Sequence, residues 1–160
     1  NLMGVAHGCE AFLPAMRRRR SGHVINVASL AGIACAPTMA PYNATKAAVI
    51  AISETLAGEL TDTGVGVTVL CPSFFPTNIM EGSRGGDPKG RKMAEKMMAK
   101  SKWSAEDVAR MTLDGAAAGQ LYVLPHAEGR LLWWVKRSAP QAFHSGAATM
   151  LAKLQKRMSS

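Results

Sequence analysis

A tyrosine and a lysine, Tyr42 and Lys46, stand four residues apart in this chain. On a helix this spacing puts both side chains on one face, one turn apart. A free phenol has a pKa of roughly 10, which makes it a poor base near neutral pH, but a nearby ammonium stabilises the phenolate and lowers that pKa. Such a phenol can exchange a proton with an alcohol or carbonyl oxygen. The pair therefore predicts acid–base chemistry; the alternative is a half-buried core tyrosine beside a solvated lysine.

A serine ends the segment that precedes this pair. Residues 22–28 form a short apolar run, which predicts a strand buried on both faces, and Ser29 follows it directly. A hydroxyl at the end of a strand can hydrogen-bond a substrate oxygen and hold it in place. Pro41 suits the first position of a helix over about 41–60, which is rich in alanine and apolar on more than one side. We expect this helix to be buried on two sides, with Gly64 ending it.

The next apolar run predicts the topology. Residues 65–71 suit a second buried strand, and strand–helix–strand over about fifty residues is a right-handed crossover in a parallel sheet. Ligands of such sheets bind beyond the carboxyl ends of the strands. Ser29, Tyr42 and residues 72–77 are all predicted at that edge.

The remaining segments complete an α/β pattern. Residues 2–20 predict a helix that Pro14 kinks or interrupts and that Gly22 caps, with four arginines at its end. We expect residues 33–40 to be a small apolar loop that forms one wall of the substrate pocket. Further on we expect a basic, methionine-rich insertion over 73–103, then a helix from the capping sequence at 104–107 to about 118, and a third strand over 120–124.

Three stretches together closely resemble the catalytic half of the short-chain dehydrogenase/reductase family. They are Asn26-Val27-Ala28-Ser29-Leu30-Ala31-Gly32, Tyr42-Asn43-Ala44-Thr45-Lys46 and Leu70-Cys71-Pro72-Ser73-Phe74-Phe75-Pro76-Thr77. The resemblance covers about residues 1–125. It implies a Rossmann-like, doubly wound parallel sheet, of which this chain would hold three strands and their helices. It also implies that Ser29, Tyr42 and Lys46 are catalytic, with Asn1 as the fourth member of the set.

The resemblance further implies NAD or NADP as cofactor. Tyr42, Lys46, Pro72, Ser73, Phe75 and Thr77 would bind it, with Lys46 at the nicotinamide ribose and Thr77 and the backbone near Phe75 at the carboxamide. Ser73 stands where the family has a glycine. The chain contains no glycine-rich turn after a first strand, which is where the family holds the pyrophosphate. We therefore expect the C-terminal part of a longer enzyme, or a truncated gene model.

Composition sets further limits. With 160 residues, 48% of them hydrophobic and 19% charged, the chain is long enough for a globular domain with its own core. The three cysteines lack metal-site spacing, which predicts no metal and a cytoplasmic protein. The net charge of +8 is spread over a helix end, the insertion and the C-terminal tail, so a nucleic-acid partner is not expected.

The tail and the partners leave alternatives open. We expect a partial Rossmann-like domain over 1–129 and a basic helical extension over 130–160, which either packs on the subunit or makes a weak contact with a membrane surface. The family implies a small-molecule substrate, which the methionines and Trp103 suggest is apolar, and a homo-oligomer through the 41–60 helix. The predicted function is hydride transfer between a nicotinamide cofactor and a secondary alcohol or ketone. The alternative is a non-catalytic binding or membrane-docking protein of the same fold.

Overall fold

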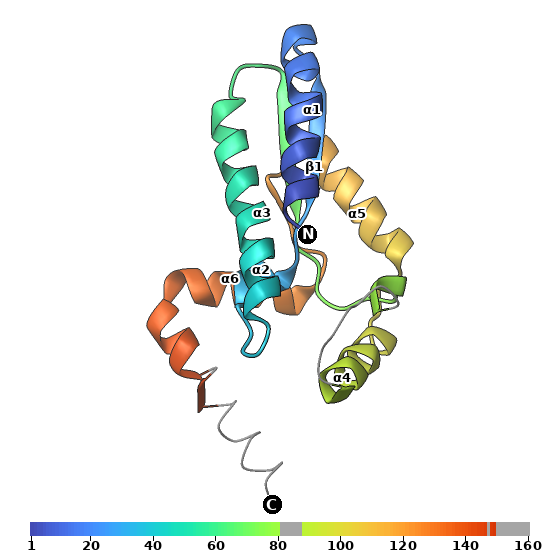
Figure 1. The fold of residues 1–160 in the computed structure, drawn as a ribbon, viewed down its shortest axis with the longest axis vertical. Coiled ribbons are helices and arrows are strands. Elements are labelled where there is room, and N and C mark those ends of the chain that lie inside the picture. The colour runs from blue at the N-terminus through green and yellow to red at the C-terminus, as the bar shows by residue number, and fades with distance from the viewer. Residues whose placement is uncertain (81–87, 147, 150–160) are drawn as a thin grey trace, which may run out of the picture.

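Figure 1 shows a computed structural model of the chain, which describes residues 1–80, 88–146 and 148–149. Helices and strands alternate along most of it. Their order is α1 (Met3–Arg19), β1 (Gly22–Val27), α2 (Leu30–Ala34), α3 (Ala40–Glu59), β2 (Val65–Leu70), the 3-10 turn η1 (Asn78–Met80), α4 (Pro88–Ala99), α5 (Ala105–Ala117), β3 (Tyr122–Val123) and α6 (Ala127–Ser138).

The three strands form one parallel sheet in the order β1-β2-β3. Gly22 pairs with Val65 and Val27 with Leu70, and β3 joins β2 through Val69 and Tyr122. This confirms the predicted parallel α/β arrangement. Strand β1 lies at the edge and pairs with β2 alone among the residues that the structure describes.

Helices cover both faces of the sheet, as a doubly wound fold requires (Figure 1). On one face, α1 and α3 pack against alternate residues of β2, in a cluster that includes Leu13, Leu60 and Val67. On the other face, Val108 of α5 packs against Leu70 and Val123. The carboxyl ends of the strands are left clear of these layers, and α2, α4 and α6 gather around that end.

Helix α1 corrects two expectations. It runs without interruption through Pro14, and it is capped by Arg20 in a left-handed conformation (φ 52°) rather than by Gly22. Cys9 and Leu13, which precede Pro14, are buried in the core, and Met16, which follows it, packs against the same cluster, so the helix stays on the sheet on both sides of the proline. Similarly, Leu60 rather than Gly64 caps α3, while Gly64 takes a left-handed turn (φ 77°) just before β2.

The loop expected over 33–40 is also corrected, because it begins inside a short helix. Ser29 caps α2: its side-chain oxygen accepts a hydrogen bond from the N–H of Ala31 at 3.1 Å. At Gly32 the backbone of α2 meets that of α3, and a Cβ there would stand 2.6 Å from the carbonyl carbon of Lys46. The lack of a side chain thus sets the spacing between the two helices.

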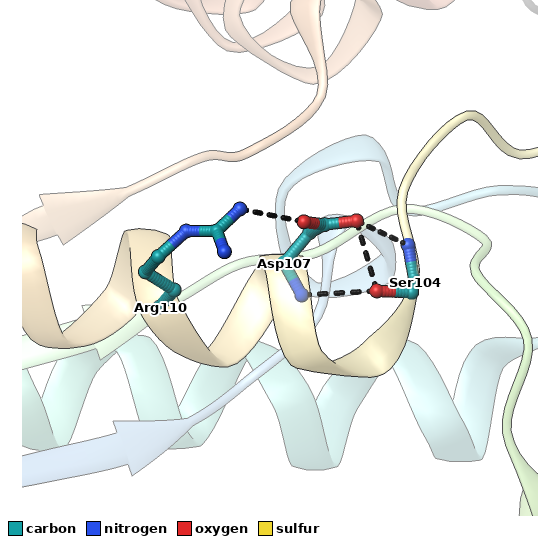
Figure 2. A network of polar contacts seen from close by, with 3 residues as sticks. All are labelled: Ser104, Asp107 and Arg110. Carbon is teal, nitrogen blue, oxygen red and sulfur yellow. Dashed lines mark hydrogen bonds and ion pairs between the residues drawn. The ribbon is translucent and has the colours of Figure 1, made fainter.

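The capping sequence before α5 is confirmed. Ser104 and Asp107 exchange hydrogen bonds of 3.1 Å between side chain and backbone N–H in both directions, and Arg110 donates to Asp107 (Figure 2). The N–H of Ser104 contributes most to lowering the pKa of the Asp107 carboxyl. The network is an exposed start for α5 and takes no part in the site below.

Helix α6 crosses the expected boundary at residue 130. Its Leu132 and Trp133 pack against the core cluster that contains Val49 and Cys71, and Lys136 donates to the carbonyl of Ile33 at 2.6 Å. The start of the basic segment therefore packs on the sheet domain. Of the helix expected toward residue 157, residues 140–146 and 148–149 are helical, and the others lie outside the described residues. The division into two domains stays a prediction. None of the described helices is long and apolar enough to cross a membrane.

Candidate active site

Two neighbouring elements carry the predicted catalytic residues to one end of β1. Ser29 stands between β1 and α2, and Tyr42 and Lys46 lie on the first turns of α3. Pro41 starts this helix, and its apolar residues Val49 and Ile50 hold it against the sheet. The first two turns of α3 therefore face the carboxyl edge of the sheet.

Lys46 is the buried member of the set. Its side chain is only 9% exposed, and its Nζ donates to the carbonyl of Val27 at 2.9 Å. The same Nζ lies 5.9 Å from the centre of the Tyr42 ring. Burial lowers the pKa of Lys46, and the nearby Cys71 thiol acts weakly in the opposite direction. The arrangement holds an ammonium next to the phenol at the end of β1.

Cys71 lies behind this pair. It is 1% exposed, and burial raises the pKa of its thiol to about 12. A thiol with this pKa stays protonated near neutral pH and is a poor nucleophile. Cys71 therefore contributes to the packing around the site and takes no part in the proposed chemistry.

Backbone hydrogen bonds tie the ends of β1 and β2 together. Leu30 donates its N–H to the carbonyl of Pro72, and Ala28 donates to Leu70, both at 2.9 Å. Ser29 is thereby fixed beside the start of the loop at 72–77. Because its oxygen accepts from Ala31, its hydroxyl hydrogen remains able to donate to a ligand.

The other predicted residues are less closely joined. Asn1 and Thr77 are both exposed. In the described part of the chain the Asn1 side chain makes no hydrogen bond, and the Thr77 hydroxyl accepts one from the N–H of Ile79. Pro72 is buried, whereas Ser73 and Phe75 are half-buried. Among the described residues no contact joins the hydroxyls of Ser29 and Tyr42. Asn1 and Thr77 therefore remain predictions without a structural link to Tyr42.

Two polar residues at this end were not predicted from the sequence. Asn43 donates to the carbonyl of Ala36 at 2.7 Å and holds the chain before α3. His126 accepts a hydrogen bond from the N–H of Ser73 at 3.2 Å and is 4% exposed. A histidine between a strand and a helix start was visible in the sequence, but no spacing rule connects it to Ser73, 53 residues away. The described residues hold no group of three metal-ligating side chains.

Comparison with known proteins gives the family. The family model described as short chain dehydrogenase matches residues 1–87, which is more than half of the chain. The chain belongs to the short-chain dehydrogenase family, and the resemblance inferred from the motifs is confirmed. Its fold agrees with a crystal structure of a short-chain dehydrogenase/reductase from Burkholderia phymatum in complex with NAD, at a TM-score of 0.79 and 31% identity, over 89% of this chain and 56% of that one.

Relatives by sequence are oxidoreductases by name. One is an uncharacterized oxidoreductase of Staphylococcus epidermidis, 43% identical over 89 residues, which are 56% of this chain and 39% of that protein. Another is named Probable oxidoreductase EphD, from Mycobacterium tuberculosis, 34% identical over 157 residues, which cover 92% of this chain and 26% of that protein. The chain thus spans well under half the length of these curated relatives. The match to EphD also extends into the basic C-terminal segment.

Proposed function

We propose that this chain carries the catalytic residues of an NAD(P)-dependent oxidoreductase acting on a secondary alcohol or ketone. The observation that carries the proposal is the ammonium of Lys46, buried against the Val27 carbonyl and 5.9 Å from the Tyr42 ring. A buried cation beside a phenol is the pair of groups that a proton transfer to or from a substrate oxygen requires.

The residues present fit the nicotinamide end of the cofactor. A buried ammonium and a phenol lie at the carboxyl edge of a parallel sheet, where dinucleotides bind in this kind of fold. When bound, the nicotinamide supplies the hydride chemistry. We propose that Tyr42 and Lys46 hold its ribose, and that the loop with Pro72, Ser73, Phe75 and Thr77 contacts its carboxamide. A relative in complex with NAD supports this assignment without choosing between NAD and NADP.

Each protein group then has a separate task. Tyr42 gives a proton to the substrate oxygen in reduction and takes it back in oxidation. Lys46 favours the phenolate through its charge, and its contact with Val27 holds the ammonium in place. Ser29 donates a hydrogen bond to the same oxygen, and Asn1 would support a proton relay through water.

The test is turnover by the protein expressed from its whole open reading frame. Ketones and secondary alcohols would be assayed with NAD(H) and NADP(H), and Tyr42→Phe should lower kcat by about a hundredfold or more, since general acid–base catalysis contributes 10²–10⁴-fold. Tyr122→Phe is the matched control, because Tyr122 donates its hydroxyl to Glu54 on the outside of α3 and should leave kcat within a few-fold. Equal losses in both variants, or turnover that survives in Tyr42→Phe, would remove the proposed role of Tyr42.

One observation favours a second function, docking to a membrane surface. Leu131 and Trp134 are 65% and 62% exposed on α6, and Arg130 and Arg137 stand near them in the same helix. Apolar and aromatic side chains beside cations suit an anionic lipid surface. Sedimentation with phosphatidylserine vesicles, compared with phosphatidylcholine vesicles, tests this, and Trp134→Ser should reduce binding.

The remaining partner assignments are part of the same proposal. A homo-oligomer would form through the face of α3 that carries Ala51, Thr55 and Gly58, all exposed in the single chain. The small-molecule substrate would be largely apolar, the location cytoplasmic, and nucleic acid would not bind. Sedimentation velocity tests whether the homo-oligomer forms, and an electrophoretic mobility-shift assay tests whether nucleic acid binds.

A further inference from the structure

A cavity of about 480 Å³ lies beside the proposed site, which it meets at Ser73, one of the proposed cofactor contacts. Its other lining residues have no role in the chemistry described so far. It opens between the loop after β2, the end of α4 with the residues that follow it, and the start of α6. Phe74, Met97 and Trp103 give it apolar walls. Its volume lies in the range of small-molecule sites in proteins.

The charges around this cavity are mostly positive. Lys100, Lys102 and Arg130 line it, and Glu128 is the one carboxylate among the described residues that line it. Arg130 is fixed at the edge, because its Nη1 donates to the carbonyls of Leu124 and Pro125 at 2.9 and 3.0 Å. Its other guanidinium hydrogens remain available, and a planar guanidinium suits a carboxylate.

The start of α6 adds donors at the same place. This helix of 12 residues has no side-chain cap at its start, where His126 is the residue before the first turn. His126, Ala127 and Glu128 line the cavity, so the first N–H groups of α6 and the positive end of its dipole lie at the cavity.

His126 itself has an unused donor. Its Nδ1 accepts from the N–H of Ser73, so the hydrogen of the neutral ring is on Nε2. Nε2 is buried and has no hydrogen-bond partner among the described residues, in a side chain that is 4% exposed. A buried donor without a partner is costly unless a ligand or water satisfies it.

We propose that this cavity binds the anionic end of the substrate, a carboxylate, while the apolar body of that substrate lies along Phe74, Met97 and Trp103. The inference rests on the proposed oxidoreductase function and narrows its substrate class to apolar ketones or secondary alcohols that carry a carboxylate. The donors that distinguish such a substrate from a neutral one are Lys100, Lys102, Arg130, the start of α6 and Nε2 of His126.

The kinetic test uses a matched pair of substrates, a medium-chain methyl ketone with a terminal carboxylate and the methyl ester of the same acid. The acid should have the higher kcat/KM, and the double variant Lys100→Ala/Lys102→Ala should lower the ratio of acid to ester by about tenfold or more. Lys96→Ala is the control, because Lys96 is an exposed cation on α4 that does not line the cavity. An acid-to-ester ratio that is unchanged in the double variant would overturn the proposal.

A second pair of variants tests the histidine. His126→Asn can keep an acceptor for the N–H of Ser73 while removing the Nε2 donor, and His126→Leu removes both. His126→Asn should raise KM for the acid and leave KM for the ester and the cofactor near their original values. If KM rises for the acid, the ester and the cofactor alike, His126 only supports the conformation of the loop that contains Ser73. That result would overturn its part in anion binding.

Binding without turnover separates this inference from the proposed function. Calorimetric titration with decanoate, and with decanol as neutral control, should show carboxylate binding that the Lys100→Ala/Lys102→Ala variant loses. If this occurs in a protein that turns over no ketone, the proposal that the cavity binds a carboxylate holds and the oxidoreductase proposal fails. If the double variant instead weakens NADP(H) binding and leaves decanoate unaffected, the cations serve a cofactor phosphate and the substrate assignment is wrong.

Discussion

Lys46 carries a charged group in a buried position. Its ammonium is buried at the end of β1 with the Val27 carbonyl as its recorded hydrogen-bond partner, and burial lowers its pKa. The folded chain therefore holds the charged form less favourably than the unfolded chain does. We infer that the charge is kept for its effect on Tyr42 and not for stability, since buried charges are seldom stabilising.

Lys46→Met tests this separation of stability from function. The variant keeps a side chain of similar length and removes the buried charge, while the Val27 carbonyl loses a hydrogen bond worth about 1 kcal/mol. We expect a Tm within a few degrees of the original, or above it, together with a loss of turnover. Differential scanning fluorimetry and kcat measure the two effects, and a large fall in Tm would show that Lys46 holds the fold together.

His23 gives a pH dependence at the same scale. Its Nε2 lies 2.8 Å from the Thr68 hydroxyl, which itself donates to the carbonyl of Gln120, so the ring donates to Thr68. Burial lowers the pKa of His23 below its usual 6.5. The unfolded chain then binds a proton that the folded chain excludes, and stability falls as the pH drops below 6.5.

Urea unfolding between pH 8 and about 5 measures this effect. His23→Gln should flatten the decline in the free energy of unfolding, because glutamine keeps a donor for Thr68 and does not titrate. His7→Gln, on an exposed turn of α1, is the control and should leave the decline as it was. A decline that is the same in all three proteins would assign the pH dependence to other groups.

At the scale of elements, the contact between α2 and α3 decides where the proposed catalytic pair, Tyr42 and Lys46, stands. Ser29 starts α2, and Gly32 lets its backbone approach Lys46 and Ala47 of α3. Because an added Cβ would lie within 2.8 Å of three backbone atoms there, no side chain can turn away to relieve the clash. The spacing of the two helices therefore fixes Ser29 relative to Lys46.

Gly32→Ala should accordingly damage both the fold and the site. We expect a loss of about 1–3 kcal/mol in the free energy of unfolding, the range for overpacking, with a fall in kcat/KM. Gly90→Ala on α4 is the matched control, since no atom lies within 4 Å of its Cβ position and alanine favours a helix by about 0.5–1 kcal/mol. A Gly32→Ala protein as stable and active as the Gly90→Ala protein would contradict this account.

At the scale of the whole molecule, β1 forms one edge of the three-stranded sheet and has a strand partner on one side only among the described residues. Val27 at the end of β1 is 52% exposed, and Phe12 on α1 is 65% exposed. An apolar groove of about 370 Å³ follows this edge between β1 and α1. Open edges of this kind pair readily with other strands.

The 160-residue chain on its own should therefore associate as its concentration rises. Size-exclusion chromatography with light scattering should show larger species, which Ile25→Lys on β1 should suppress because a charge on an edge strand opposes pairing. Leu113→Lys on α5 is the control for nonspecific hydrophobic association, because this leucine is 61% exposed. Equal suppression by both variants would show that the edge is not the cause.

The sequence by itself determined the family, the parallel topology and the position of the helix that carries Tyr42 and Lys46. The spacings of Ser29, Tyr42 and Lys46 and the period of the apolar runs are local properties, and local patterns predict elements and their order. The same local reasoning misjudged Pro14, the cap of α1 and the segment 33–40, because tertiary contacts of Cys9, Leu13 and Gly32 override propensity there.

Only the tertiary structure decided which residues meet across long separations. The contact of Lys46 with Val27, the bond from Ser73 to His126 and the docking of Lys136 on Ile33 join residues 19, 53 and 103 positions apart. The cavity lined by Phe74, Met97 and Trp103 depends on α4 and α6 approaching each other at the carboxyl end of the sheet, and neither helix shows this in its own sequence. Such contacts are set by how whole elements pack, which no single stretch of residues encodes.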